Sequence, residues 1–345
     1  MASKALAIKY RPTTFNEVVE QDSIKIILQQ QIKENSFKSA YLFVGGAGTG
    51  KTTCARIFAH DINNGQGNPI ELDAASNNGV DDVREIIQQA KTKSLDSEYK
   101  IFIIDECHAL SNSAWQAMLK IIEEPPAKSI FIFCTTDPQK IPKTILSRVQ
   151  RYDFQRISQE GIVHRLKQIL HDEDIYVTAK EIETISPSVE YIAKIADGGM
   201  RDAITLMDKC LAYSKILTLE NVISALGTVD YETMIHLSAD ILVKNAKAVV
   251  VRVEELHASG KDIKQFVKQY LQFLLDIQKF GVGCDWKYLQ VPKIEDYEDW
   301  FEDLKSHDYD VLESVLKAMI KLNADIKWSS TPKYDLEAVL YMECL

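Results

Sequence analysis

The sequence predicts an α/β first half, in which a parallel sheet is flanked by helices, followed by an all-helical second half. Up to about residue 157, short apolar runs alternate with segments of helical periodicity, which is the pattern of a parallel sheet. After about residue 158 the strand-like runs stop and helical spacing continues. A glycine-rich segment also separates the first apolar run from a helix, as in proteins that bind phosphate groups.

The predicted strands are apolar almost throughout, and we expect each to be a buried central strand because parallel strands are covered on both faces. The runs are AYLFVG, PIELDAA, KIFIIDE and SIFIFCTT, followed by the shorter RYDFQRI. Helices are predicted near residues 22–34, 51–62, 79–93 and 112–123. The last of these should stop before Pro125, because proline has no N–H to continue a helix.

The second half is predicted to be helical only. Residues 161–170, 188–196 and 201–214 have apolar spacings of three and four, and Pro187 is suited to the first turn of the second of these helices. Several later helices are apolar on more than one side. This fits either packing against partner subunits or burial within one large bundle.

The composition is that of an ordinary globular protein of two or three domains, with 345 residues, 46% hydrophobic and 26% charged. No stretch reaches the length of a membrane span, and the N-terminus has no apolar signal region, so we expect a cytoplasmic protein without membrane contact. The six cysteines include no C-x-x-C pair, which argues against zinc and against a disulfide framework.

The net charge of −10 is unevenly distributed. Residues 1–158 carry 19 Lys and Arg against 18 Asp and Glu, whereas residues 159–345 carry 21 against 32. The near-neutral first half can still present a local basic face to phosphate.

The segment GGAGTGKTT matches the G-x-x-x-x-G-K-[ST] template, after a strand and before a helix. Its glycines let successive N–H groups point at phosphate, and the helix N-terminus adds partial positive charge. Lys51 is expected to reach the β- and γ-phosphates and Thr52 to bind Mg²⁺. The predicted nucleotide-binding residues of this segment are Gly45, Gly46, Ala47, Gly48, Thr49, Gly50, Lys51, Thr52 and Thr53.

Two carboxylates, Asp105 and Glu106, follow the apolar run of residues 100–104, at the edge where open α/β sheets bind ligands. Asp105 is expected to hold Mg²⁺, and Glu106 to orient and deprotonate the attacking water. Alternatively, the two acids merely cap the next helix. His108 and Trp115, which follow them, are interpreted as packing residues.

Hydroxyl and guanidinium groups farther along the chain are candidates for phosphate contact. Thr135 and Thr136 end the next strand at the same edge, although Thr-Thr before Asp-Pro is also an ordinary turn. Arg148 follows a short helical segment, and Arg201 opens a later helix. Each arginine is equally explained as a surface residue.

Several motifs together resemble the ATPase subunit of bacterial sliding-clamp loaders, the gamma/tau subunits of DNA polymerase III. The motifs are YRPTTFNEVVEQ, GGAGTGKTT, ELDAASNNGVDDVREI, IFIIDECHALSNSAWQAMLKIIEEPP, FCTTDPQKIPKTILSRV and GGMRDAI, and they cover about residues 4–210. The resemblance implies an AAA+ fold with an α/β P-loop core at 1–158, a three-helix lid at 159–221 and an all-α collar at 222–345. The family implies ATP and Mg²⁺ as ligands.

The resemblance also implies roles for individual residues. Thr136 would be the first sensor, with Thr135 as the alternative, and Arg201 the second sensor. Arg148 would be an arginine finger that acts in the adjacent subunit's site. The segment that packs on adenine would comprise Tyr10, Arg11, Pro12, Val18 and Val19.

The sequence departs from the family pattern at four places. The four-cysteine zinc module is replaced by HDINNGQGNPI, so no zinc is expected, and the family's Ser-Arg-Cys reads Ser-Arg-Val at Val149. Glu20 stands where the pattern has glycine, which places an acid near the nucleotide. The chain also stops at the collar, without the family's C-terminal tail. We interpret it as a minimal loader subunit of a type that a phage could encode.

Primer-template DNA is the nucleic acid that the resemblance implies, recognised by shape and charge. The candidate contacts are Asn77, Asn78, the free N–H groups before Val80, and Arg84. The alternative is an ordinary surface helix capped by asparagine.

The leading functional hypothesis is an ATP-hydrolysing subunit that opens a sliding clamp and loads it onto primer-template DNA during replication. The implied partners are the clamp and other loader subunits, in a homo- or hetero-oligomer expected to be a pentamer. One alternative is a non-hydrolysing structural subunit of the same assembly. Another is a branch-migration motor, although no winged-helix pattern follows the helical region.

Overall fold

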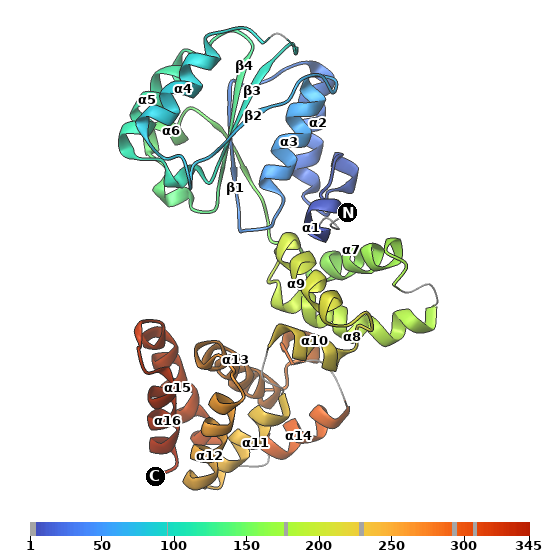
Figure 1. Ribbon diagram of the computed structural model, residues 1–345, viewed down its shortest axis with the longest axis vertical. Coiled ribbons are helices and arrows are strands. Elements are labelled where there is room, and N and C mark those ends of the chain that lie inside the picture. The colour runs from blue at the N-terminus through green and yellow to red at the C-terminus, as the bar shows by residue number, and fades with distance from the viewer. Residues whose placement is uncertain (1–4, 95, 176–178, 228–230, 292–294, 306–308) are drawn as a thin grey trace. The chain divides into compact units, whose positions relative to one another are not determined.

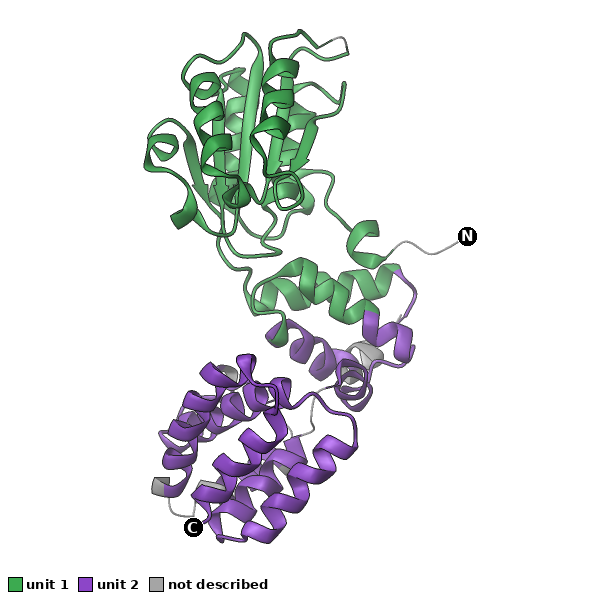
Figure 2. Cartoon of the chain, turned by 60° about the vertical axis from the view of Figure 1, so that its left-hand side comes forward, with its two compact units in different colours: residues 1–172, 195–208 green, residues 173–194, 209–345 purple. Residues whose placement is uncertain are grey.

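The computed structural model describes residues 5–94, 96–175, 179–227, 231–291, 295–305 and 309–345. The chain divides into two compact units, which Figure 2 colours separately. Unit 1 comprises residues 1–172 and 195–208, and unit 2 comprises residues 173–194 and 209–345. We describe each unit by itself. The three-part division at residues 158 and 221 stays a prediction.

Unit 1 is built on a five-stranded parallel sheet with the order β2-β3-β4-β1-β5. All five predicted strands are present: β1 (Ala40–Val44), β2 (Ile70–Asp73), β3 (Lys100–Asp105), β4 (Ser129–Thr135) and β5 (Gln150–Asp153). The three inner strands are almost wholly buried. The expectation of burial is wrong for β2 and β5, because these strands form the two edges of the sheet and expose alternate residues.

Helices cover both faces of this sheet (Figure 1). On one face, Leu42 and Val44 of β1 pack with α4 (Val80–Ala90), α5 (Asn112–Glu123) and α6 (Lys143–Leu146). On the other face, Tyr41 and Phe43 pack with α2 (Asp22–Glu34) and α3 (Lys51–Ile62). Successive residues of a strand point to opposite faces, so one apolar strand contributes to two cores.

Short elements and two longer helices complete unit 1. The short elements are α1 (Leu6–Lys9), η1 (Phe15–Glu17), η2 (Cys107–Ala109) and η3 (Pro138–Lys140). Helix α7 (Gln159–Asp172) and the first part of α9 (Met200–Tyr213) also belong to this unit. Helix α5 stops at Glu123 as predicted, two residues before Pro125.

The described part of unit 2 contains helices and no strand. The longer helices are α8 (Ala179–Ile195), α10 (Leu219–Leu226), α11 (Tyr231–Leu242), α12 (Ala246–Ala258), α13 (Ile263–Gly281), α14 (Glu295–Lys305), α15 (Tyr309–Asp325) and α16 (Pro332–Glu343). The shorter ones are η4 (Trp286–Tyr288) and η5 (Ile326–Trp328). Helix α13 packs against α15, and α12 packs against α16.

One predicted helix start is wrong. Helix α8 begins at Ala179, so Pro187 lies inside it rather than in its first turn. Proline removes one backbone hydrogen bond within a helix. On the C-terminal side of Pro187, Val189 and Ile192 are fully buried. This burial stabilises the helix and outweighs the unfavourable effect of proline within it. No helix in the described residues is long and apolar enough to cross a bilayer.

Candidate nucleotide-binding site

A cavity of about 250 Å³ lies in unit 1. Four segments meet there: the GGAGTGKTT segment of residues 45–53, called the phosphate loop below, the end of β3, residues 7–19 and the start of α9. The sequence-predicted residues that line it are Tyr10, Arg11, Pro12, Val18, Val19, Ala47, Gly48, Thr49, Gly50, Lys51, Thr52, Thr53, Asp105, Glu106 and Arg201. Four other predicted residues are not part of its lining: Gly45, Gly46, Thr136 and Arg148.

The phosphate loop needs glycine where the chain turns left-handed and where another segment approaches. Gly48 and Gly50 have φ of 69° and 102°, a region that favours glycine. A Cβ atom on Gly48 would lie 3.0 Å from the Gly199 Cα, and the Met200 N–H donates to the Gly48 carbonyl over 3.0 Å. The loop therefore lies directly against the start of α9.

Lys51 is the first residue of α3 and is buried, with 5% of its surface exposed. Its ammonium group donates to the Gly45 carbonyl over 2.9 Å and to the Gly46 carbonyl over 2.8 Å. Burial lowers the pKa of Lys51, and the Glu106 carboxylate partly opposes this effect. The loop thus holds a desolvated cation at the cavity.

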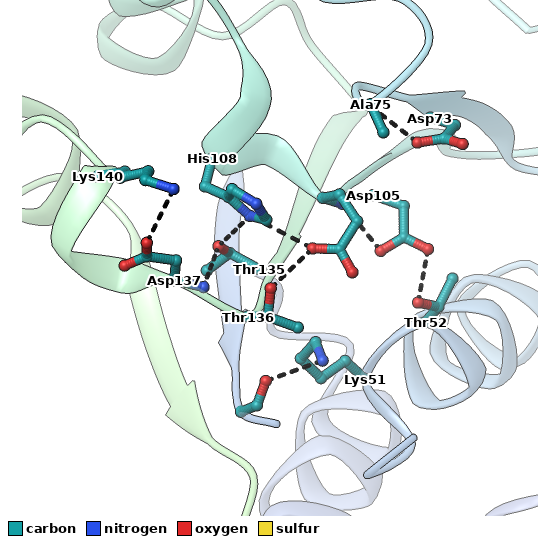
Figure 3. Close-up of polar contacts among 12 residues, drawn as sticks. Lys51, Thr52, Asp73, Ala75, Asp105, His108, Thr135, Thr136, Asp137 and Lys140 are labelled. Atoms are coloured by element: carbon teal, nitrogen blue, oxygen red, sulfur yellow. Dashed lines mark hydrogen bonds and ion pairs between the residues drawn. The ribbon is translucent and has the colours of Figure 1, made fainter. Parts of the chain in front are cut away.

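Asp105 ends β3, and its Oδ2 atom accepts a hydrogen bond from the Thr52 hydroxyl over 2.8 Å (Figure 3). Its Oδ1 atom accepts the Glu106 N–H over 3.0 Å. A hydroxyl and a carboxylate are both oxygen ligands of the kind that Mg²⁺ prefers. The donor set at this edge therefore fits the magnesium ion that the sequence implies.

Glu106 has a left-handed φ of 46° and does not cap the following η2 helix with its side chain. Instead, its Oε2 atom accepts a hydrogen bond from Thr136 over 3.1 Å and lies 3.3 Å from the His108 Nδ1 atom. His108 from η2 and Thr136 from the end of β4 therefore approach the same oxygen of this carboxylate. The capping alternative considered for the two acids is therefore absent at Glu106.

The two threonines at the end of β4 have different surroundings. Thr135 is fully buried and its hydroxyl contacts His108 Nδ1 over 3.1 Å, whereas Thr136 bonds to Glu106. The interpretation of His108 as a packing residue is therefore incomplete. No sequence signal pointed to His108, because its contacts depend on the tight η2 turn and on β4.

Charged side chains of both signs line the cavity, with the cations Arg11, Lys51, Arg165 and Arg201 beside the carboxylates of Glu17, Asp105, Glu106 and Asp202. Arg11 is half-buried, and burial lowers its pKa, with the Arg56 and Arg201 guanidinium groups adding to the effect. Arg165, which the sequence analysis did not single out, also lines the cavity and donates to the Tyr10 carbonyl over 3.3 Å. Converging cations of this kind suit a ligand with several negative charges.

Glu20 is not part of the cavity lining, although it follows Val19 directly. Its carboxylate accepts hydrogen bonds from the backbone N–H and the hydroxyl of Ser158, immediately before α7. The acid therefore caps the entrance to α7, where a negative charge is favoured by the helix dipole.

Arg148 lies after α6, with 38% of its side chain exposed. Its guanidinium group forms an ion pair with Glu123 over 2.7 Å and donates to the Thr144 carbonyl over 2.6 Å. The side chain is therefore held at the surface by its own subunit.

The candidate DNA contacts Asn77, Asn78 and Arg84 are all exposed. One expectation about this segment is wrong: the Gly79 N–H is not free, because it donates to the Asp82 carboxylate over 3.0 Å. Gly79, rather than an asparagine, is the N-cap of α4. Arg84 pairs with Asp81 over 2.7 Å. Phosphate would therefore have to compete with acidic groups for these donors.

Comparison with solved structures shows the fold class. The Thermotoga maritima RuvB Holliday junction branch migration motor matches with a TM-score of 0.52 and 16% identity, over 84% of this chain and 97% of that one. At this identity the likeness concerns the fold alone. Together with the site, it defines the class of protein: a P-loop core on a parallel sheet, followed by helical regions.

Comparison with protein families and curated sequences is more specific. Residues 70–158 match the family described as DNA polymerase III, delta subunit, and residues 161–216 match the DNA polymerase III clamp loader subunit, ATPase lid domain. The Bacillus subtilis DNA polymerase III subunit tau is 34% identical over 100% of this chain and 64% of its own length. The Haemophilus influenzae subunit tau/gamma is 37% identical over 70% of this chain and 37% of its own length.

The chain is similar to the gamma/tau subunits of DNA polymerase III. It spans less than two thirds of the length of the curated relatives that it matches.

Proposed function

We propose that this protein is an ATP-hydrolysing subunit of a clamp loader, which opens a sliding clamp and loads it onto primer-template DNA during replication. The observation that carries the proposal is the meeting of Lys51, Thr52, Asp105 and Glu106 around one cavity. These groups come from one strand end and one helix start, and phosphoryl transfer requires such positioning and charge stabilisation.

Each group has a distinct task in the proposed reaction. Lys51 and the loop N–H groups bind the β- and γ-phosphates, and Thr52 and Asp105 hold Mg²⁺, which when bound neutralises phosphate charge. Glu106 takes the proton of the attacking water. Thr136 senses the γ-phosphate, which is supported over Thr135 because Thr135 is buried while Thr136 contacts Glu106.

The remaining contacts would bind the base and complete the site. Tyr10, Pro12, Val18 and Val19 give the cavity its apolar part, which is suited to adenine. Arg201 would act as second sensor. Arg148 is not part of the lining of the cavity in its own chain, which supports a role as an arginine finger for a neighbouring subunit.

We further propose the assembly that these roles require. Residues 159–221 would form the lid, supported by the lid-family match at residues 161–216, and residues 222–345 the collar. Other loader subunits would complete a pentamer in the cytoplasm. Asn77, Asn78 and Arg84 would face DNA, and the acidic neighbours of Arg84 would keep the affinity of a single subunit low.

Two alternatives remain distinguishable. A structural subunit without hydrolysis would have no need for the Glu106 carboxylate. A branch-migration motor would share the RuvB-like fold, but the family matches are to polymerase III subunits rather than to such motors.

The test is a clamp-loading assay with fluorescent clamp, primed DNA and candidate partner subunits, comparing the wild type with Glu106→Gln. We expect the wild type to load and release the clamp repeatedly, and Glu106→Gln to bind ATP without turnover. Full loading by Glu106→Gln would favour the structural subunit. Movement of a Holliday junction, with no clamp loading, would favour the branch-migration motor.

A further inference from the structure

The two oxygens of the Glu106 carboxylate are not equivalent. The hydroxyl of Thr136 and the Nδ1 atom of His108 both approach Oε2, at 3.1 Å and 3.3 Å. In the described part of the chain, no hydrogen bond or ion pair falls on Oε1. The carboxylate is thus anchored through one oxygen, and the other is left for a substrate.

The imidazole of His108 is itself held in place. It belongs to the short η2 helix directly after Glu106, and only 20% of its side chain is exposed. Its Nδ1 atom also lies 3.1 Å from the hydroxyl of Thr135, which accepts the Asp137 N–H over 3.0 Å. His108 therefore links the carboxylate to the buried end of β4.

The Nδ1 atom lies between Oε2 of Glu106 at 3.3 Å and the Thr135 hydroxyl at 3.1 Å. A carboxylate oxygen accepts, whereas a hydroxyl can either donate or accept, so the contact with Glu106 favours the tautomer with the proton on Nδ1. Glu106 also needs such support, since its φ of 46° is a conformation that a residue with a side chain adopts at a cost of roughly 1 kcal/mol or more. The surrounding contacts keep this conformation populated.

We infer that His108 is a positioning residue for the general base: its Nδ1–H holds Oε2 of Glu106 so that Oε1 faces the attacking water. This inference rests on the proposed ATPase function. It assigns His108 no contact with nucleotide. A general base acts only within hydrogen-bond reach of the proton that it takes, so a loosened carboxylate slows hydrolysis without weakening ATP binding.

The test compares three substitutions that place a donor differently. His108→Ala removes the ring. The amide nitrogen of His108→Asn reaches the position of Nδ1, whereas that of His108→Gln reaches the position of Nε2. For each variant, kcat, the KM and Kd for ATP, and the melting temperature are measured in the complete assembly with clamp and primed DNA.

We expect His108→Ala and His108→Gln to lower kcat by about tenfold, with KM and Kd changed less than about twofold, and His108→Asn to restore most of the rate. In a Glu106→Gln background, His108→Ala should cause no further loss, because the two residues act as one unit.

Other outcomes overturn the inference. An unchanged kcat for His108→Ala does so. An equal fold-loss of kcat from His108→Ala in the wild type and in the Glu106→Gln background does so as well. A loss that follows the melting temperature in all three variants shows a purely structural histidine. Active wild type with insensitive His108 variants overturns this inference alone, whereas an inactive wild type overturns the proposed function as well.

Discussion

The hydroxyl of Thr52 donates a hydrogen bond to Oδ2 of Asp105 over 2.8 Å. This bond joins the first turn of α3 to the end of β3. The donor and the acceptor are 53 residues apart in the sequence. Two motifs that are remote in sequence thereby present oxygen ligands at one point. The arrangement explains why the proposed magnesium site needs both.

Thr52→Val should abolish this ligand while preserving the shape of the side chain. We expect the rate of Mg²⁺-dependent ATP hydrolysis to fall at least about tenfold, since a hydroxyl ligand is replaced by a methyl group. Thr52→Ser keeps the hydroxyl and should retain most of the rate. The measurement is a titration of hydrolysis against Mg²⁺, and identical curves for Thr52→Val and the wild type would argue against the proposed metal site.

Lys51→Met should weaken nucleotide binding without lowering the thermal stability of the free protein. Burial lowers the pKa of Lys51 from its ordinary value of 10.5, so the unfolded chain binds this proton more tightly than the folded chain. The wild type therefore gains stability as pH rises toward that value. Without nucleotide, Lys51→Met should melt at or above the wild-type temperature at pH 7, and this difference should shrink toward pH 10.

The same variant should lose the rise in melting temperature that ATP gives the wild type. Thermal melts with and without ATP at several pH values provide both readouts. A Lys51→Met protein that melts well below the wild type at pH 7, or that is still stabilised by ATP, would contradict this assignment of Lys51.

The phosphate loop offers a matched pair of glycine substitutions. Gly48→Ala combines a left-handed φ of 69° with a Cβ atom 3.0 Å from Gly199, whereas Gly46→Ala meets nothing nearer than Thr49 at 3.7 Å. We expect Gly48→Ala to weaken ATP binding by about tenfold or more, because strain of 1–2 kcal/mol falls on the loop. Gly46→Ala should bind within about twofold of the wild type. Equal affinities in an equilibrium titration would show that the loop tolerates a side chain at residue 48.

A buried carboxylate stabilises unit 2. Asp276 has no exposed side-chain surface and accepts hydrogen bonds from Lys279 Nζ and the Val291 N–H, each over 3.0 Å. Asp276→Ala would leave the buried Val291 N–H without its acceptor and remove the buried partner of Lys279, and should cost roughly 3 kcal/mol. Glu313→Ala removes a half-exposed partner of Lys317 and should cost less than about 1 kcal/mol. Urea denaturation of both variants measures the difference, and similar midpoints would contradict the role of Asp276.

The sheet and most of the site could be predicted because their signals are local. A parallel strand buried on both faces is an apolar run, and the phosphate loop has fixed spacing around Lys51. The edge positions of β2 and β5 depend on strand order, which no single run contains. The start of α8 was missed because tertiary burial keeps Pro187 within the helix.

Side-chain partners were less predictable than positions. Glu20 was expected near nucleotide on its sequence neighbours alone, but Ser158, 138 residues away, takes its carboxylate. His108 was interpreted as packing because a histidine after two acids has no characteristic pattern. Its contact with Glu106 depends on the left-handed turn at Glu106, which the sequence does not indicate.

The most direct test of the account is steady-state ATP hydrolysis by the wild type and by Lys51→Ala and Arg148→Ala, each alone and with partner subunits, clamp and primed DNA. Because the contacts of Arg148 with Glu123, Thr144 and Ser147 all lie at the exposed surface, Arg148→Ala should leave stability nearly unchanged. We predict synergistic stimulation by clamp and primed DNA that either substitution abolishes. A low rate that clamp and DNA do not stimulate, and that is insensitive to Arg148→Ala, would contradict a motor with shared sites.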